Sequence, residues 1–82
     1  MILLGQLLDV INENELLTIR SSHERSLVFI DEVKAGEAKM LLTKDSRKCV
    51  VSDFYSDISD RSQRDTVSVI YIKPNGYLIT TE

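Results

Sequence analysis

The chain has 82 residues, of which 43% are apolar, and its 13 acidic and 10 basic side chains leave a formal net charge of −3. This length predicts a single domain over residues 1–82, and the apolar content is too high for a disordered chain. The mild negative charge disfavours a nucleic-acid-binding domain, because such domains usually present a basic surface to the phosphates.

The first segment, residues 2–11, has apolar side chains at the spacing of an amphipathic helix. Leucines and an isoleucine recur at intervals of three and four residues, while Gln6 and Asp9 lie on the opposite face. A helix this short is marginal in isolation, so we expect it to dock on a sheet. Gly5 lies inside the pattern and indicates either close packing on that sheet or a late start of the helix.

Two strands are predicted next, over residues 16–20 and 26–31, because both stretches are rich in apolar and β-forming residues. The polar turn between them, residues 21–25, is short, so we expect the two strands to form an antiparallel hairpin. His23 is the only histidine of the chain and lies in this turn. It has no second ligand or base at a suitable spacing, and we expect it to be exposed to solvent.

The following stretch, residues 33–44, is compatible with two structures. Gly36 could turn a hairpin, but three apolar side chains have helical spacing and nearly all their neighbours are good helix formers, so a second helix is favoured. Residues 47–55 predict a strand in which Cys49 packs as a small apolar residue. Because Cys49 is the only cysteine, it forms no intramolecular disulfide, which suits a reducing cytosol.

Residues 56–65 form the most polar stretch and are predicted to be a loop. Its aspartates lack the regular spacing and the glycine of an oxygen-ligated metal site, so a solvated loop is favoured over a metal centre. A contact loop for a partner protein is the functional alternative, because long loops in compact domains are often functional. The candidate partner-binding residues are Asp53, Tyr55, Asp57, Asp60, Arg61 and Arg64.

The last part of the chain predicts two strands joined by a turn. Over residues 66–73 the side chains alternate between two faces that both carry apolar groups, which is typical of a central strand. Residues 74–76, Pro-Asn-Gly, are a strong turn signal, and residues 77–81 are expected to return as the final strand. Tyr71 and Tyr77 flank this turn and are expected to pack across the strands rather than to stack on nucleic-acid bases.

Together these elements predict a two-layer α+β domain in the order helix, strand, strand, helix, strand, strand, strand. The sheet is expected to be mainly antiparallel, with about five strands and two short helices on one face. Ile70, Ile72, Leu78 and Thr80 would then form an apolar sheet face that the helices leave open. An open apolar face of this kind predicts a homodimer interface.

The opening motif Leu7-Leu8-Asp9-Val10-Ile11, followed by Leu17-Thr18-Ile19, resembles that of small uncharacterised α+β proteins of Gram-positive phages and prophages. The order of elements agrees over most of the chain. The resemblance implies an accessory protein of a mobile element. Some small acidic phage proteins of similar size inhibit host defence, and the anti-CRISPR proteins are among them.

The sequence contains no catalytic, metal-binding or phosphate-binding motif, so we expect neither an enzyme nor a cofactor. The leading hypothesis is a protein-binding accessory protein that acts on a host or phage protein in the bacterial cytoplasm. The alternative is a small nucleic-acid-binding domain that uses a basic patch of Lys44, Arg47 and Lys48. No stretch approaches the roughly 20 apolar residues that span a membrane, so we expect no membrane segment.

Overall fold

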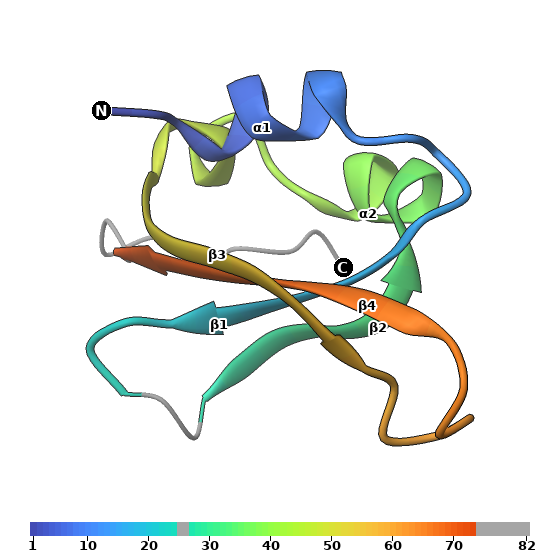
Figure 1. Ribbon diagram of the computed structural model, residues 1–82. Helices are drawn as coiled ribbons and strands as arrows, with labels where there is room; N and C mark the ends of the chain where they lie inside the picture. The colour runs from blue at the N-terminus through green and yellow to red at the C-terminus, as the bar shows by residue number, and fades with distance from the viewer. Residues whose placement is uncertain (25–26, 74–82) are drawn as a thin grey trace.

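The computed structural model describes residues 1–24 and 27–73. Its elements are α1 (Leu4–Val10), β1 (Leu16–Ser21), β2 (Val28–Lys34), α2 (Ala35–Leu41), the short 3₁₀ helix η1 (Ser46–Lys48), β3 (Val50–Ile58) and β4 (Thr66–Lys73). The strands form one sheet in the order β2-β1-β4-β3, and both helices lie on the same side of it (Figure 1). The α+β class with two helices, expected from the sequence, is confirmed.

The sheet is mixed rather than mainly antiparallel. β1 pairs with β2 and β3 pairs with β4 in antiparallel fashion, whereas the central strands β1 and β4 run parallel. The expectation was wrong because the parallel pair joins segments that are far apart in the chain, which local hairpin signals cannot reveal. The described residues form four strands instead of about five, and the strand expected at residues 77–81 lies outside them.

The other expected segments form, with shifted ends. Residues 66–73 form β4, and the stretch at 33–44 contains the helix α2, so the alternative hairpin is wrong. β3 continues to Ile58, and the loop that was expected from residue 56 begins only after it. The strand is longer than its polar sequence suggested because β4 offers it backbone partners along its whole length, from Val50 opposite Lys73 to Ile58 opposite Thr66.

The core lies between the helices and the side of the sheet that faces them. Its largest fully buried apolar side chains are Leu4, Leu8, Leu17, Ile19, Ile70 and Ile72. Alternate residues of the two central strands point toward the helices, so one side of β1 and of β4 is packed beneath α1 and α2. The open apolar face expected at Ile70 and Ile72 was therefore wrong, because the short helices lie over the middle of the sheet; Leu78 and Thr80 lie outside the described residues.

The beginning of α1 packs against η1. The Leu4 amide donates to the Cys49 carbonyl oxygen over 2.9 Å. A Cβ atom on Gly5 would lie 3.1 Å from Cβ of Arg47, so the glycine permits a close approach, although to η1 rather than to the sheet. Cys49 is 2% exposed and belongs to the core, as the sequence predicted, and His23 is exposed in its turn.

Candidate functional site

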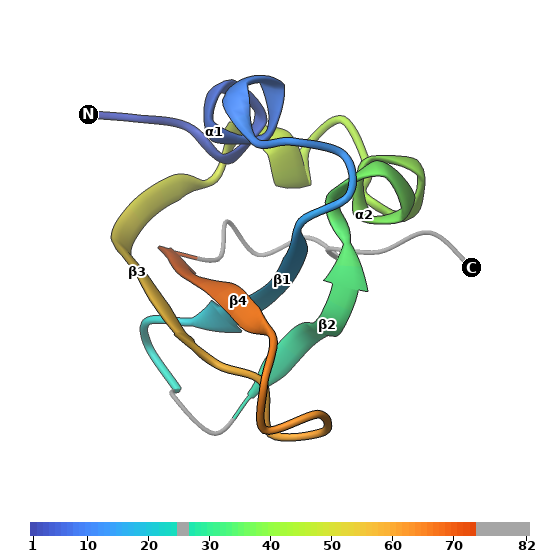
Figure 2. The same cartoon turned by 45° about the vertical axis from the view of Figure 1, so that its right-hand side comes forward.

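The sheet face away from the helices is concave, because the two edge strands are tied together across it. The Ser59 hydroxyl donates to one carboxylate oxygen of Glu32 on β2, and the Asp60 amide donates to the other over 3.1 Å. Nearby, Nη2 of Arg61 lies 3.4 Å from Oδ2 of Asp31. The loop after β3 therefore meets β2, which lies at the other edge of the sheet (Figure 2). We call the interaction of Glu32 with Ser59 and Asp60 the Glu32 contact.

A bulge in β2 positions the two acidic side chains of this strand. Residues 31 and 32 stand opposite the single residue Thr18 of β1, where the register of the ladder shifts. Glu32 has a φ of 51°, which is uncommon outside glycine, and its amide donates to Oγ1 of Thr18 over 3.1 Å. The hydrogen bonds of its amide and carboxylate hold this conformation, and they place Asp31 and Glu32 beside the loop that follows β3.

The curled sheet encloses a hollow of about 180 Å³. The hollow is lined by Thr18, Arg20, Asp31, Glu32, Tyr55, Asp57, Ile58, Asp60, Val67, Val69 and Tyr71. Its charged lining thus consists of four carboxylates and one guanidinium group. Ordinary ligand sites have volumes of roughly 300–1,000 Å³, so the hollow has room for a single side chain or a small cation rather than for a nucleotide-sized cofactor.

Two tyrosines from neighbouring strands stack in the lining of the hollow. The rings of Tyr55 and Tyr71 have centroids 6.2 Å apart and planes inclined by 29°. The hydrogen bond between their side chains, followed by loss of hydration and the nearby Asp57 carboxylate, raises the pKa of Tyr55 above its usual value of about 10. The sequence suggested Tyr77 as the neighbour of Tyr71; Tyr77 lies outside the described residues, and the stacked neighbour is Tyr55.

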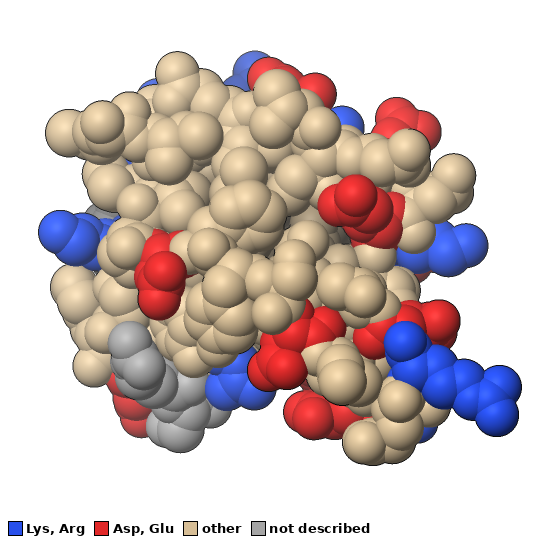
Figure 3. Space-filling model, viewed as in Figure 1, with Lys and Arg blue, Asp and Glu red and all other residues tan. Residues whose placement is uncertain are grey.

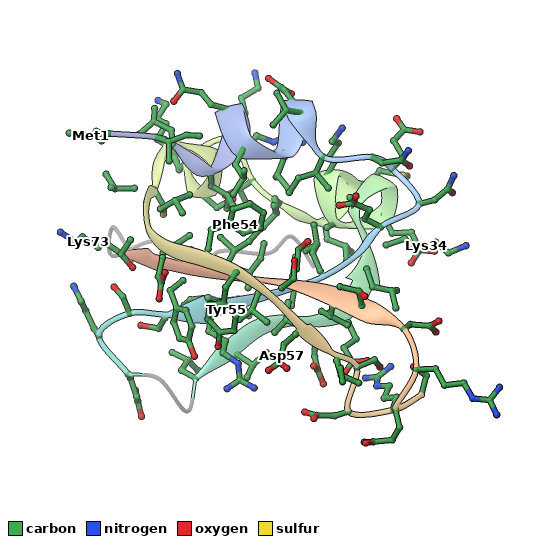
Figure 4. The ribbon with its side chains drawn as sticks, in the orientation of Figure 1. Met1, Lys34, Phe54, Tyr55, Asp57 and Lys73 are labelled. Carbon is green, nitrogen blue, oxygen red and sulfur yellow. The ribbon has the colours of Figure 1, made fainter. Side chains whose placement is uncertain are left out.

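β3 exposes two large apolar side chains. Phe54 is 46% exposed and Ile58 is 61% exposed. Phe54 points toward the helices, whereas Tyr55 and Asp57 point to the opposite side of the strand (Figure 4). In the view of Figure 1, uncharged side chains occupy the centre of the surface. Acidic side chains gather below them, around the end of β3 and the following loop (Figure 3).

The outer edge of β3 is paired only near its start within the described residues. There it meets the segment that precedes α1. Farther along, the amides of Phe54 and Ile58 donate to Oδ1 of Asp53 and Asp57, over 2.9 Å and 2.8 Å. Because these amides donate to carboxylates of their own strand, we infer that they face the edge that is not paired with β4.

The structure brings together half of the candidate partner-binding residues. Tyr55, Asp57 and Asp60 line the hollow. Asp53 lies on the same side of β3, because its partner in β4 is two residues from the partner of Tyr55. Arg64 is exposed in the loop and does not line the hollow, while the other candidate arginine forms the ion pair with β2 described above.

Sequence reasoning missed three charged residues of the hollow, Arg20, Asp31 and Glu32. They belong to the β1–β2 hairpin and form no motif with the polar stretch after β3. The only available signal was a pair of adjacent charges within a stretch rich in β-forming residues, which is compatible with a bulge. That signal does not indicate which distant segment the charges meet.

The basic patch expected at Lys44, Arg47 and Lys48 lies around η1 and is partly neutralised. The Arg47 guanidinium group donates to the carbonyl oxygen of Lys39. Nζ of Lys48 lies 3.9 Å from Oδ1 of Asp45. Two of the three cations of the patch therefore have partners within the chain, and the charge of one of them, Lys48, is offset by the carboxylate of Asp45.

The part of the chain that the structure describes contains neither a cluster of metal-ligating side chains nor a membrane-spanning helix. Within residues 1–24 and 27–73, no three histidine, cysteine or acidic side chains are grouped so that they could hold a metal ion. Over the same ranges, no helix combines the length and the apolar character needed to cross a membrane.

No protein-family model, no curated protein and no solved structure matches the chain.

Proposed function

We propose that the chain is a non-enzymatic protein-binding protein whose binding surface consists of the hollow and the outer edge of β3. The observation that carries the proposal is that one strand combines an open edge, the exposed side chains of Phe54 and Ile58, and the mouth of an acidic hollow. Exposed edge strands are usually shortened or covered, and β3 has nine residues. Apolar patches with polar rims mark interaction surfaces.

The resemblance to small phage and prophage proteins supports a role as an accessory protein of a phage or another mobile element. In this proposal, the chain occupies a surface of a host or phage protein in the cytoplasm of a bacterial host. Its single, buried cysteine is in keeping with a reducing compartment. Inhibition of host defence, as by anti-CRISPR proteins, is the specific activity that we propose to test first.

A small nucleic-acid-binding domain is the less supported alternative. The hollow carries an excess of carboxylates, which repel phosphates, and the basic patch around η1 is partly neutralised. An electrophoretic mobility shift at low salt would favour this alternative, because electrostatic binding to nucleic acid is strongest there. We expect no shift.

A photo-crosslinking amino acid at position 58 tests the proposal. Ile58 is 61% exposed beside the hollow, and Met40, 82% exposed on α2, provides a control position on the helix side. In Gram-positive cells that express each variant, we expect one dominant adduct with another protein from position 58 and none from position 40. No adduct from position 58, or the same adducts from both positions, would contradict the proposal.

A plating experiment tests the specific activity. Expression of the chain in cells with active CRISPR immunity should raise the plating efficiency of a targeted phage. Unchanged plating would exclude the anti-CRISPR activity in that system, while the crosslinking result would still decide whether the surface binds a protein.

A further inference from the structure

We propose that the outer edge of β3 accepts an extended segment of a partner protein as an added strand, and that this segment alternates basic and apolar residues. The inference rests on the proposed function, since it names the kind of segment that the same surface takes. Strand addition to an open edge is a common mode of peptide recognition, in which backbone hydrogen bonds provide affinity and alternate side chains provide specificity.

The two sides of β3 present different chemistry to an added strand. Phe54 and Ile58 are exposed and alternate along the strand with the residues of the hollow side; Phe54 faces the helix side, and Ile58, at the end of the strand, also reaches the lip of the hollow. Asp53, Tyr55 and Asp57 lie on the side of the hollow. Successive side chains of an added strand point to opposite sides, so each side meets every second residue of the partner. We therefore expect apolar partner residues beside Phe54 and Ile58 and basic ones beside the aspartates.

The aspartates favour a basic partner over a neutral one. In the free chain, the amides of Phe54 and Ile58 donate to Asp53 and Asp57 over 2.9 Å and 2.8 Å. The carbonyl groups of an added strand would accept these amides, so each carboxylate would lose a donor. A lysine or arginine beside each carboxylate replaces that donor with a charge-assisted hydrogen bond, which a neutral apolar side chain cannot supply.

Asp57 connects this edge with the hollow. Its carboxylate accepts the amide of Ile58 and also lines the hollow near Asp60. The hollow measures about 180 Å³, compared with roughly 30 Å³ for one water molecule, so it has room for one cationic head group. A basic side chain that reaches Asp57 from an added strand can therefore extend toward the other carboxylates.

In the register centred on Tyr55, a second copy of the chain fits this edge poorly. If two β3 strands paired antiparallel about Tyr55, Asp53 of each copy would stand opposite Asp57 of the other. Like charges directly opposite each other destabilise a strand pair. The same carboxylates therefore disfavour this pairing between copies and favour a basic strand from another protein.

Binding of a synthetic peptide tests the inference. The probe is a fluorescently labelled six-residue peptide of alternating lysine and valine, matching residues 53–58, which follow the paired start of β3, and binding to the full chain is read by fluorescence anisotropy. One control peptide has the same composition arranged in two blocks, and the other alternates glutamate and valine. We expect saturable binding of the first peptide alone, weakening as salt increases. Equal binding of the block peptide, or no binding of the alternating basic one, would overturn the inference.

The double variant Asp53→Asn with Asp57→Asn separates charge from shape. Asparagine keeps an oxygen that can accept the same amides, but it removes both negative charges. We expect the peptide affinity to fall about tenfold, as the loss of two exposed ion pairs implies. The control variant, Asp9→Asn with Glu37→Gln, removes the same charge from exposed positions of the helix layer and should leave affinity unchanged. No loss in the first variant, or an equal loss in the control, would argue decisively against the inference.

Hydrogen exchange distinguishes this inference from the proposed function. Strand addition should slow exchange of the Phe54 and Ile58 amides when the alternating peptide is bound, because these amides then donate to the added strand. If the alternating basic peptide does not bind while the crosslink from position 58 is still observed, strand addition is wrong and the proposed protein-binding function stands. If position 58 gives no crosslink, the proposed function itself is wrong.

Discussion

The two faces of the sheet are built from the same central strands, yet different groups cover them. On the helix side, Ile70 of β4 is fully buried against helical leucines. On the other side, Val69 and Tyr71 are each 8% exposed, and both described helices lie on the opposite side of the sheet. They line the hollow together with side chains of all four strands, Thr18, Arg20, Glu32 and Tyr55 among them. One face of the sheet is therefore stabilised by apolar packing, whereas the other is shaped by a few polar contacts and carries a charged hollow.

The largest expected effect comes from the packed face. Ile70→Ala should lower the free energy of unfolding by about 2–5 kcal/mol, because it leaves a cavity beneath the helices. Ile58→Ala removes the same atoms from a side chain that is 61% exposed, and it should cost about 0.5 kcal/mol or less. Urea denaturation of both variants measures the difference. Similar losses of unfolding free energy in the two variants would show that the two positions do not differ in packing, which would contradict the contrast between the packed face and β3.

The next largest effect concerns the Glu32 contact. Glu32→Ala removes the acceptor of the Ser59 hydroxyl and the Asp60 amide, and it should cost about 2 kcal/mol, as expected for hydrogen bonds to a charged group. Glu32→Gln keeps an oxygen acceptor and should cost less. Glu37→Ala, at an exposed position of α2, is the control for charge removal in urea denaturation. A loss in Glu32→Ala no greater than in the control would show that the contact does not hold the concave face.

A smaller effect concerns the tyrosine pair and its pH dependence. Because folding raises the pKa of Tyr55, the unfolded chain releases this proton first, so the contribution to stability is present below about pH 10 and is lost as pH rises through the folded-state pKa. Tyr71→Phe removes the hydrogen bond and should lower the pKa of Tyr55 toward its usual value. Phenolate absorbance follows the titration. Asp57→Asn should lower the pKa of Tyr55 by less than Tyr71→Phe does. A larger decrease in Asp57→Asn would contradict the hydrogen bond to Tyr71 as the main cause of the raised pKa.

The smallest effect separates the ion pair at the rim from the Glu32 contact. Arg61 and Asp31 have side chains that are 68% and 57% exposed, so Arg61→Ala should cost less than about 1 kcal/mol. Lys48→Ala removes the comparably exposed ion pair near η1 and is the matched control, with a similarly small cost. If Arg61→Ala destabilises the chain as much as Glu32→Ala, the concave face is held mainly by ion pairing.

The packed face was readable from the sequence, because its signals are local. The spacing of leucines in residues 2–11 indicated α1, and the alternation over residues 66–73 indicated a central strand with both faces buried. The candidates for the binding surface that the sequence indicated at the end of β3 and in the loop after it included Tyr55, Asp57 and Asp60, and all three line the hollow. The sequence did not predict that these residues share the hollow with Arg20 and with the bulge in β2, because no sequence pattern pairs segments so far apart.

Local spacing was sufficient for the α+β class, for the order of the described elements and for most of the core, since neighbouring residues decide which side chains share a face. The parallel pairing of β1 with β4, the positive φ of Glu32 and the hollow arise only in the folded chain. Glu32 meets Ser59 across 27 positions of the sequence, and the lining of the hollow comes from all four strands and one loop. No single stretch of the sequence contains that surface, because it forms only when the curled sheet brings its two edges together.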